Sequence, residues 1–192
     1  MNAMSLVALG SLSIISFTTQ ALEFNQVLND KSSVSFTYKQ SGIAMEGKFR
    51  KLTAKIAFDP AKAASASTQI DIDLNSIDAG SSEADEEAAG KLWFNSKLFP
   101  VAKFGSTGVK ALGGNRFEAI GKLTIKGKTT DVMAPFTFRQ ESIAGKPVAV
   151  FEGMFVIKRL EYAIGEGIWA DVSAVANEIP VKFRITAVAV NP

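Results

Sequence analysis

Alternation of apolar and polar residues with a period of two is the feature of this sequence that most restricts its fold. Seven runs show it, at residues 34–38, 52–58, 70–74, 117–125, 132–138, 151–157 and 181–185. Successive side chains of a strand point to opposite faces, so each run has one apolar and one polar face. Parallel strands buried on both faces would instead read as continuous apolar runs. The sequence therefore predicts an antiparallel sheet with one face toward water.

Such a sheet must close on itself or stack on a second sheet, because an open one would expose its apolar face and two unpaired edges. The long run from Phe117 to Ile125 favours a barrel over a sandwich. We predict an all-β fold, an eight-stranded antiparallel β-barrel. The interior of such a barrel is either filled by side chains or holds one small ligand. Gly47, Gly121 and Gly153 interrupt apolar runs, so they predict bends or bulges that let the sheet curl.

One short helix is predicted around residues 83–90. Ser82 is the candidate N-cap, with Asp85 as its capping-box partner, and Gly90 lies near the end. The acidic residues at 83, 85, 86 and 87 suit the positive end of a helix dipole. A hard cation such as calcium is the alternative use of these carboxylates. The capping argument favours a solvated helix start.

The amino-terminal segment predicts export. Residues 6–17 are mostly apolar and are followed by Thr19-Gln20-Ala21, a small-x-small pattern suited to cleavage after Ala21. The run is shorter than the roughly 20 residues that a transmembrane helix needs. We expect a signal peptide at 1–21, one mature domain at 22–192 and a periplasmic location. The alternative is a buried helix or strand.

Histidine and cysteine are both absent, which excludes most catalytic constellations. There is no Ser-His-Asp triad, no Cys-His pair and no usual zinc site. The 21 basic and 19 acidic residues are balanced and spread along the chain, so nucleic acid is not an expected partner. We predict no catalytic residues and no metal ligands.

Short blocks of sequence, each unspecific alone, follow one another in a characteristic order. They are Ser33-Val34-Ser35-Phe36, Gly47-Lys48-Phe49, Phe58-Asp59-Pro60, the segment 70–78, Leu92-Trp93-Phe94-Asn95, the segments 99–104 and 121–129, and the stretch from Phe155 to Val181. In this order they resemble the YceI-like family of periplasmic isoprenoid-binding proteins. The resemblance implies an extended, lipocalin-like eight-stranded barrel with a long apolar channel, and no established catalytic site. It also implies a polyisoprenoid or an isoprenoid quinone as the ligand and a role in the stress response.

The chain departs from that family pattern at two places. Family members often carry a histidine just before the first strand, where this chain has Lys31-Ser32-Ser33, and a basic residue in the helix, where residues 83–89 have none. The head-group contacts are therefore expected to differ, whereas a tail-binding channel depends only on apolar faces.

Fourteen residues are candidates for the channel lining, chosen because they lie on apolar faces. They are Phe36, Tyr38, Phe49, Ile56, Phe58, Ile70, Ile72, Leu74, Phe104, Leu123, Phe136, Phe155, Ile157 and Trp169. Plain core packing is the alternative for each of them, and about half are expected to touch a ligand, since small barrels are normally filled. For Trp169 the alternative is a cap at one end of the barrel.

The predicted function is that of a carrier for an isoprenoid lipid or quinone. No cofactor is expected apart from a bound polyisoprenoid or ubiquinone-like ligand. Two alternatives stay open: a hydrolase or isomerase that acts on a small apolar substrate with carboxylates, and an interaction protein without lipid. Contact with a membrane or a membrane enzyme, and a homodimer, are further expectations. Arg159 and Glu161, after the 151–157 run, either orient a polar head group or form a surface ion pair.

Overall fold

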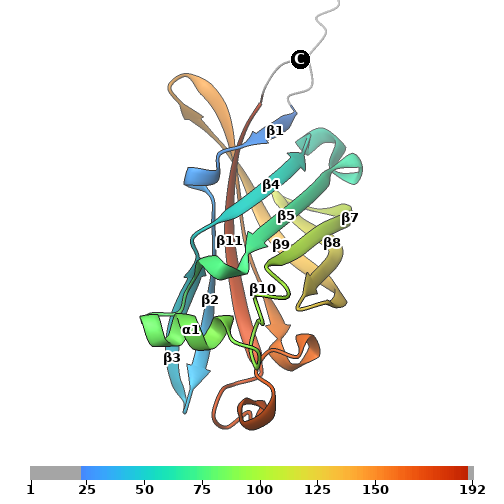
Figure 1. Ribbon diagram of the computed structural model, residues 1–192. Coiled ribbons are helices and arrows are strands. Elements are labelled where there is room, and N and C mark those ends of the chain that lie inside the picture. Colours follow the sequence, from blue (N-terminus) through green and yellow to red (C-terminus); the bar gives the residue numbers. More distant parts are fainter. Residues whose placement is uncertain (1–22, 190–192) are drawn as a thin grey trace, which may run out of the picture.

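The computed structural model describes residues 23–189, which form one curled antiparallel sheet with a single α-helix (Figure 1). The strands are β1 Phe24–Val27, β2 Ser33–Gln40, β3 Ile43–Phe49, β4 Leu52–Ala57, β5 Ser67–Asp73, β6 Ile77–Asp78, β7 Val101–Gly113, β8 Arg116–Ile125, β9 Lys128–Ile143, β10 Lys146–Lys158 and β11 Glu178–Ala189. The helix is α1 Ser82–Ala89, and the 3₁₀ helices are Asn29–Lys31, Pro60–Ser65, Leu74–Ser76, Arg159–Tyr162 and Gly167–Ala170. The predicted signal peptide lies outside the described residues. None of the helices in residues 23–189 is long and apolar enough to cross a bilayer.

The all-β prediction is confirmed, but the strand number is corrected from eight to eleven. The sheet runs in the order β4-β5-β7-β8-β9-β10-β11-β2-β3-β6, and β1 pairs with the free half of β11. Phe24 of β1 also exchanges two main-chain hydrogen bonds with Phe58, at 2.9 and 3.2 Å, just beyond β4. Through β1 the sheet therefore closes into a ring at this end, the upper end of Figure 1.

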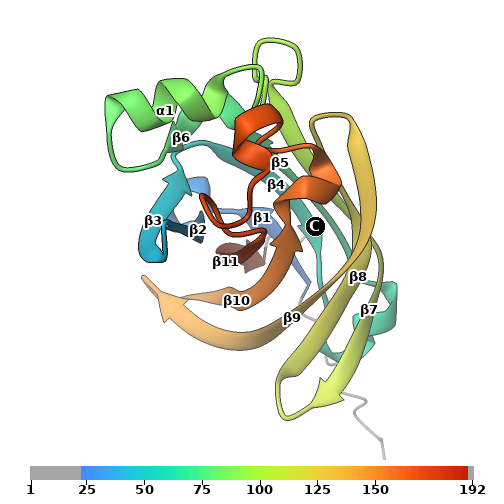
Figure 2. The ribbon, with the colours of Figure 1, turned by 90° about the horizontal axis from the view of Figure 1, so that it is seen from below.

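At the opposite end strand pairing does not close the sheet, and α1 and two 3₁₀ helices lie there instead. Figure 2 looks into this end and shows α1 along one edge of the curled sheet, beside β3 and β6, and the 3₁₀ segments after β10 nearer the centre. The lower half of the wall is also divided, because the β9–β10 ladder stops at Phe136 and Gly153 although β10 continues to Lys158. The hydroxyl of Tyr162 bridges the division through a hydrogen bond to the hydroxyl of Thr130 on β9.

The helix begins one residue earlier than predicted, and its cap is a different serine. Ser81, not Ser82, is the N-cap, and its Oγ accepts a hydrogen bond from the Ala84 N–H at 3.2 Å. Asp85 does not close a capping box, because its Oδ1 accepts from the Ala79 N–H at 2.6 Å. This contact ties α1 to the end of β6, and Gly90 ends the helix as expected.

The three strand glycines make room for aromatic rings. A Cβ at Gly47 would lie 2.3 Å from the Phe36 ring, and Phe104 and Phe183 cover Gly121 and Gly153 in the same way. Of the three, only Gly121 adjoins a register shift, the one between Ser106 and Gly108 on β7. The ladders run through Gly47 and Gly153 without a register shift, so of the predicted bends or bulges no bulge occurs there, and the absent side chain lets a phenylalanine ring lie over each glycine.

We expect Gly153→Ala to lower the free energy of unfolding by about 1–3 kcal/mol, because the added methyl meets main chain that cannot swing away. Its Cβ would lie 2.3 Å from the carbonyl oxygen of Pro135. Gly105→Ala is the matched control, since a Cβ there meets nothing within 4 Å. Urea unfolding followed by circular dichroism measures both variants. Equal stabilities would contradict this packing role.

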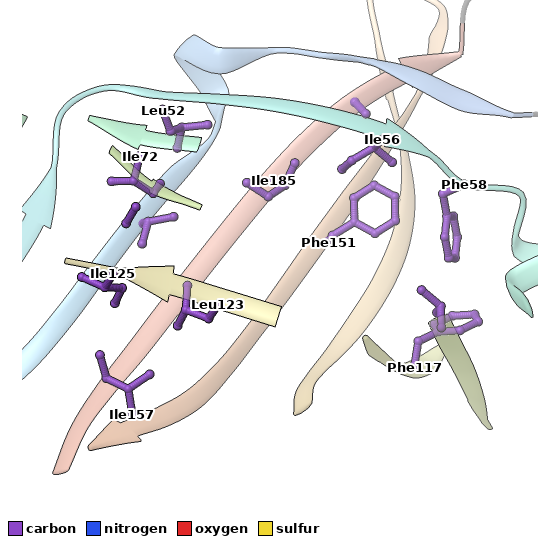
Figure 3. Packing of buried hydrophobic residues seen from close by; sticks show 14 of the residues in the cluster. Leu52, Ile56, Phe58, Ile72, Phe117, Leu123, Ile125, Phe151, Ile157 and Ile185 are labelled. Atoms are coloured by element: carbon purple, nitrogen blue, oxygen red, sulfur yellow. The ribbon is translucent and has the colours of Figure 1, made fainter. Parts of the chain in front are cut away.

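Phenylalanine rings fill the closed end of the barrel. Their centroids lie 5.0–6.4 Å apart, within the usual range for aromatic pairs. Figure 3 shows Phe58, Phe117 and Phe151 directed toward one another there. The cluster consists of Phe24, Phe58, Phe117, Phe136, Phe138 and Phe151. This end of the interior is therefore solid.

Candidate binding cavity

Between the phenylalanine cluster and α1 the barrel holds a cavity of about 450 Å³. Phe58, Phe136 and Phe151 form its floor, and α1 and the segment around Trp169 form its cover. This volume is in the range of pockets that enclose small organic ligands. The inner faces of the strands supply almost the whole wall, so the cavity is apolar. The phenylalanine floor closes it at one end.

All fourteen residues predicted to line a channel lie on the wall of this cavity. Figure 3 shows the inward direction of Ile56, Ile72, Leu123 and Ile157 among them. Contact of these side chains with a ligand stays a prediction. Trp169, which lies in the 3₁₀ helix Gly167–Ala170, belongs to the cover.

The polar lining residues gather at the covered end, with the exception of Thr68 on β5. They are Tyr38, Gln40, Glu83, Glu87, Trp93, Arg159 and Trp169. Of these, the predicted lining contained only Tyr38 and Trp169. Trp93 belongs to a sequence block of the family resemblance, outside the alternating runs, and nothing in the alternation pattern indicates the two glutamates.

Glu87 of α1 joins the two tryptophans of the chain. Its Oε1 accepts hydrogen bonds from the indole N–H of Trp93 at 3.2 Å and of Trp169 at 2.8 Å. The two indole rings lie 5.5 Å apart and are tilted toward each other. This contact holds the 3₁₀ helix Gly167–Ala170 against α1, so the two parts of the cover are linked by a hydrogen bond.

Arg159 lies beneath the cover, with only 1% of its surface exposed. Its Nε donates to the Ala176 carbonyl, and its two Nη atoms donate to the carbonyls of Ile164, Gly165, Trp169 and Val175, at 2.7–3.2 Å. A guanidinium has five N–H donors, and these five bonds engage all of them. The prediction of a surface ion pair is wrong: Arg159 is buried and its hydrogen bonds go to main-chain carbonyls that would otherwise lack donors.

Lys126 fixes the cover from the side of the β8–β9 turn. The side chain is buried, and its Nζ donates to the carbonyls of Lys91 and Ala163, at 3.0 and 2.7 Å, and to Glu166 Oε2, at 2.7 Å. The hydrogen bond and the charge of Lys126 lower the pKa of Glu166. The segment 163–166 is therefore tied to the barrel wall.

The carboxylates at the cavity do not have the environment of a catalytic acid. Glu83 and Glu87 are exposed on their outer sides. Hydrogen bonds from its own main-chain N–H and from Ser81 lower the pKa of Glu83, whereas a general acid at neutral pH needs a raised one. Among residues 23–189 no three acidic side chains lie together as a metal site would require.

The curled antiparallel sheet surrounds an apolar cavity that is closed at one end. The protein therefore belongs to the class of small β-barrels with an internal pocket. The family described as "YceI-like domain" matches residues 26–187, so the chain belongs to the YceI-like family.

Known relatives agree with this assignment. The crystal structure of BcnA from Burkholderia cenocepacia is 41% identical, with a TM-score of 0.80 over 84% of this chain and 99% of that one. A UPF0312 protein of Azotobacter vinelandii is 26% identical over 96% of this chain and 97% of its own length. A structure described as a polyisoprenoid binding domain from Saccharophagus degradans shares the fold at 16% identity, with a TM-score of 0.67 over 88% of this chain and 99% of that one.

Proposed function

We propose that this protein holds the tail of one polyisoprenoid lipid or isoprenoid quinone in its cavity and carries that lipid in the periplasm. The observation that supports this most is the apolar cavity of about 450 Å³, which the phenylalanine cluster closes at one end. Each methylene that leaves water is worth about 0.8 kcal/mol, so a greasy tail needs an apolar tube more than it needs hydrogen bonds. The Saccharophagus degradans domain, described as polyisoprenoid binding, supports the same tail chemistry here.

The protein acts by binding in this proposal, not by catalysis. Glu87 is engaged by two indole N–H groups, and Glu83 lies at the rim with a lowered pKa. The periplasmic location follows from the predicted signal peptide. A role under stress, a homodimer and contact with a membrane stay predictions.

Organic extraction of the protein, purified from its own host without detergent, tests the proposal. Mass spectrometry of the extract is expected to show an isoprenoid lipid at about one molecule per protein. Protein that is empty after this purification, and that takes up no isoprenoid when mixed with one, would contradict it. Extraction of fatty acid or phospholipid alone would do so as well.

A further inference from the structure

Every hydrogen-bond donor of four side chains at the covered end of the cavity already has a partner within the protein. The Tyr38 hydroxyl donates to the Ala79 carbonyl at 3.0 Å, and the indoles of Trp93 and Trp169 donate to Glu87. Arg159 uses all five N–H groups on carbonyls of the cover. Gln40 adds one neutral amide to this end. A ligand that only accepts hydrogen bonds therefore meets almost no free donor.

Acceptors, by contrast, remain available there. Glu87 uses Oε1 for both indoles, and its Oε2 has no hydrogen bond to any of the residues 23–189. Glu83, one turn earlier on α1, lies at the rim of the same cavity, where it is exposed and its carboxylate accepts hydrogen bonds from its own main-chain N–H and from Ser81. Its lowered pKa means that this group is ionised at neutral pH. The covered end thus has one oxygen acceptor without a hydrogen bond, Glu87 Oε2, and a second negative charge at its rim.

The charges at this end also disfavour an anionic ligand. Two carboxylates line the cavity against a single guanidinium, whose N–H groups all point into the main chain of the cover. Lys126, the nearby buried cation, is paired with Glu166. A phosphate placed here would approach two like charges and exchange its water for the amide of Gln40 as the one remaining donor group, which is unfavourable on both counts.

We propose that the covered end of the cavity selects lipids whose polar end donates hydrogen bonds or is cationic, such as a hydroxyl, an amide N–H or an ammonium group, and disfavours phosphate and carboxylate ends. Of the ligands proposed above, it favours a prenol or the reduced quinol over the oxidised quinone, whose head group only accepts hydrogen bonds. This selectivity rests on the proposed function, because it concerns the polar end of the lipid whose tail fills the same cavity. The floor of Phe58, Phe136 and Phe151, backed by the rest of the phenylalanine cluster, leaves the polar end only the covered side.

Three probes with one common tail test this: farnesol, farnesylamine and farnesyl phosphate, each added below its micelle concentration to delipidated protein. Trp93 and Trp169 are the two tryptophans of the chain and both line this end, so their fluorescence reports binding directly. We expect the amine to bind at least as tightly as the alcohol. We expect the phosphate to bind about tenfold more weakly than the alcohol, or worse.

Neutral variants of the carboxylates sharpen the test. Glu83→Gln removes one charge without breaking the bonds between Glu87 and the indoles, and we expect it to tighten farnesyl phosphate and weaken farnesylamine, each several-fold. The affinity for farnesol is expected to stay within about twofold. Glu86→Gln is the matched control, because Glu86 lies on the same helix but not on the cavity wall.

The outcomes separate this inference from the function beneath it. If farnesyl phosphate binds as tightly as farnesol, or if Glu83→Gln leaves the order of the probes as Glu86→Gln does, the selectivity is wrong while lipid binding stands. If none of the three probes binds, both are wrong.

Discussion

Arg159→Lys is expected to lower the free energy of unfolding by about 2–4 kcal/mol, a large effect for the exchange of one cation for another. Lysine has three donors on a single atom and cannot reproduce the planar fork that serves five carbonyls. Arg159 is 1% exposed, so the carbonyls that lose their donor stay out of water. We expect the cover over the cavity to loosen, with a red shift of the tryptophan emission as Trp169 gains water.

Urea unfolding followed by circular dichroism measures the stability, and fluorescence spectra of the folded state measure the cover. Arg139→Lys is the control, because Arg139 is half exposed and pairs with Glu141 and Glu152 at the surface. Surface pairs of this kind contribute about 0–1 kcal/mol. If the two variants lose the same stability and keep the same emission, Arg159 does not organise the cover.

Phe155→Asp is expected to abolish lipid retention and to lower the free energy of unfolding by about 3–5 kcal/mol or prevent folding. The side chain lies on the cavity wall and packs on Phe183 across the β10–β11 pair. A carboxylate at this place would enter apolar surroundings, and Arg159, the guanidinium on the same cavity wall, has no N–H group left for it. The lipid content after organic extraction and the urea midpoint are the two measurements.

Val156→Asp is the matched control, since the neighbouring residue points to the outside and is 52% exposed. It introduces the same charge on the same strand and is expected to keep its lipid and its stability within about 0.5 kcal/mol. A Phe155→Asp variant with normal stability and normal lipid content would show that the inner face has been assigned to the wrong residues.

The alternation of residues predicted the strands whose inner face is buried and missed the others for identifiable reasons. The seven alternating runs fall on β2, β4, β5, β8, β9, β10 and β11, and those on β4 and β5 extend one residue past the strand end. β1 has four residues and β6 has two, too few for a period to show. Ile43 and Met45 of β3 are exposed, so the strand lacks a buried face there, and the register shift between Ser106 and Gly108 breaks the pattern in β7.

The candidate site divides in the same manner. Its apolar wall could be predicted, because the inward residues of a strand recur at every second position of the sequence. The cover could not, because its main contacts join Arg159 to main-chain carbonyls, which every residue possesses. The bond between Glu87 and Trp169 spans 82 residues and carries no local signal. The acidic helix therefore read as a solvated surface, although two of its glutamates line the cavity.

The two ends of the barrel consequently have different tasks. The closed end is packed by phenylalanine rings and contributes stability, since burial of large apolar side chains is the main favourable term in folding. The covered end is held by polar contacts of Arg159, Lys126 and Glu87, and no cluster of packed rings closes it. Lipid entry and release are expected at the covered end.

Titration of the delipidated protein with prenols of increasing length tests most directly whether the barrel interior has room for a tail. Geraniol, farnesol and geranylgeraniol differ by one isoprene unit each, and the tryptophan emission gives a dissociation constant for each alcohol. Because every unit brings five carbons into an apolar tube, affinity should rise by about tenfold or more per unit until the tail reaches the phenylalanine floor, and then level off. Dissociation constants that are weak and independent of chain length would contradict an open interior.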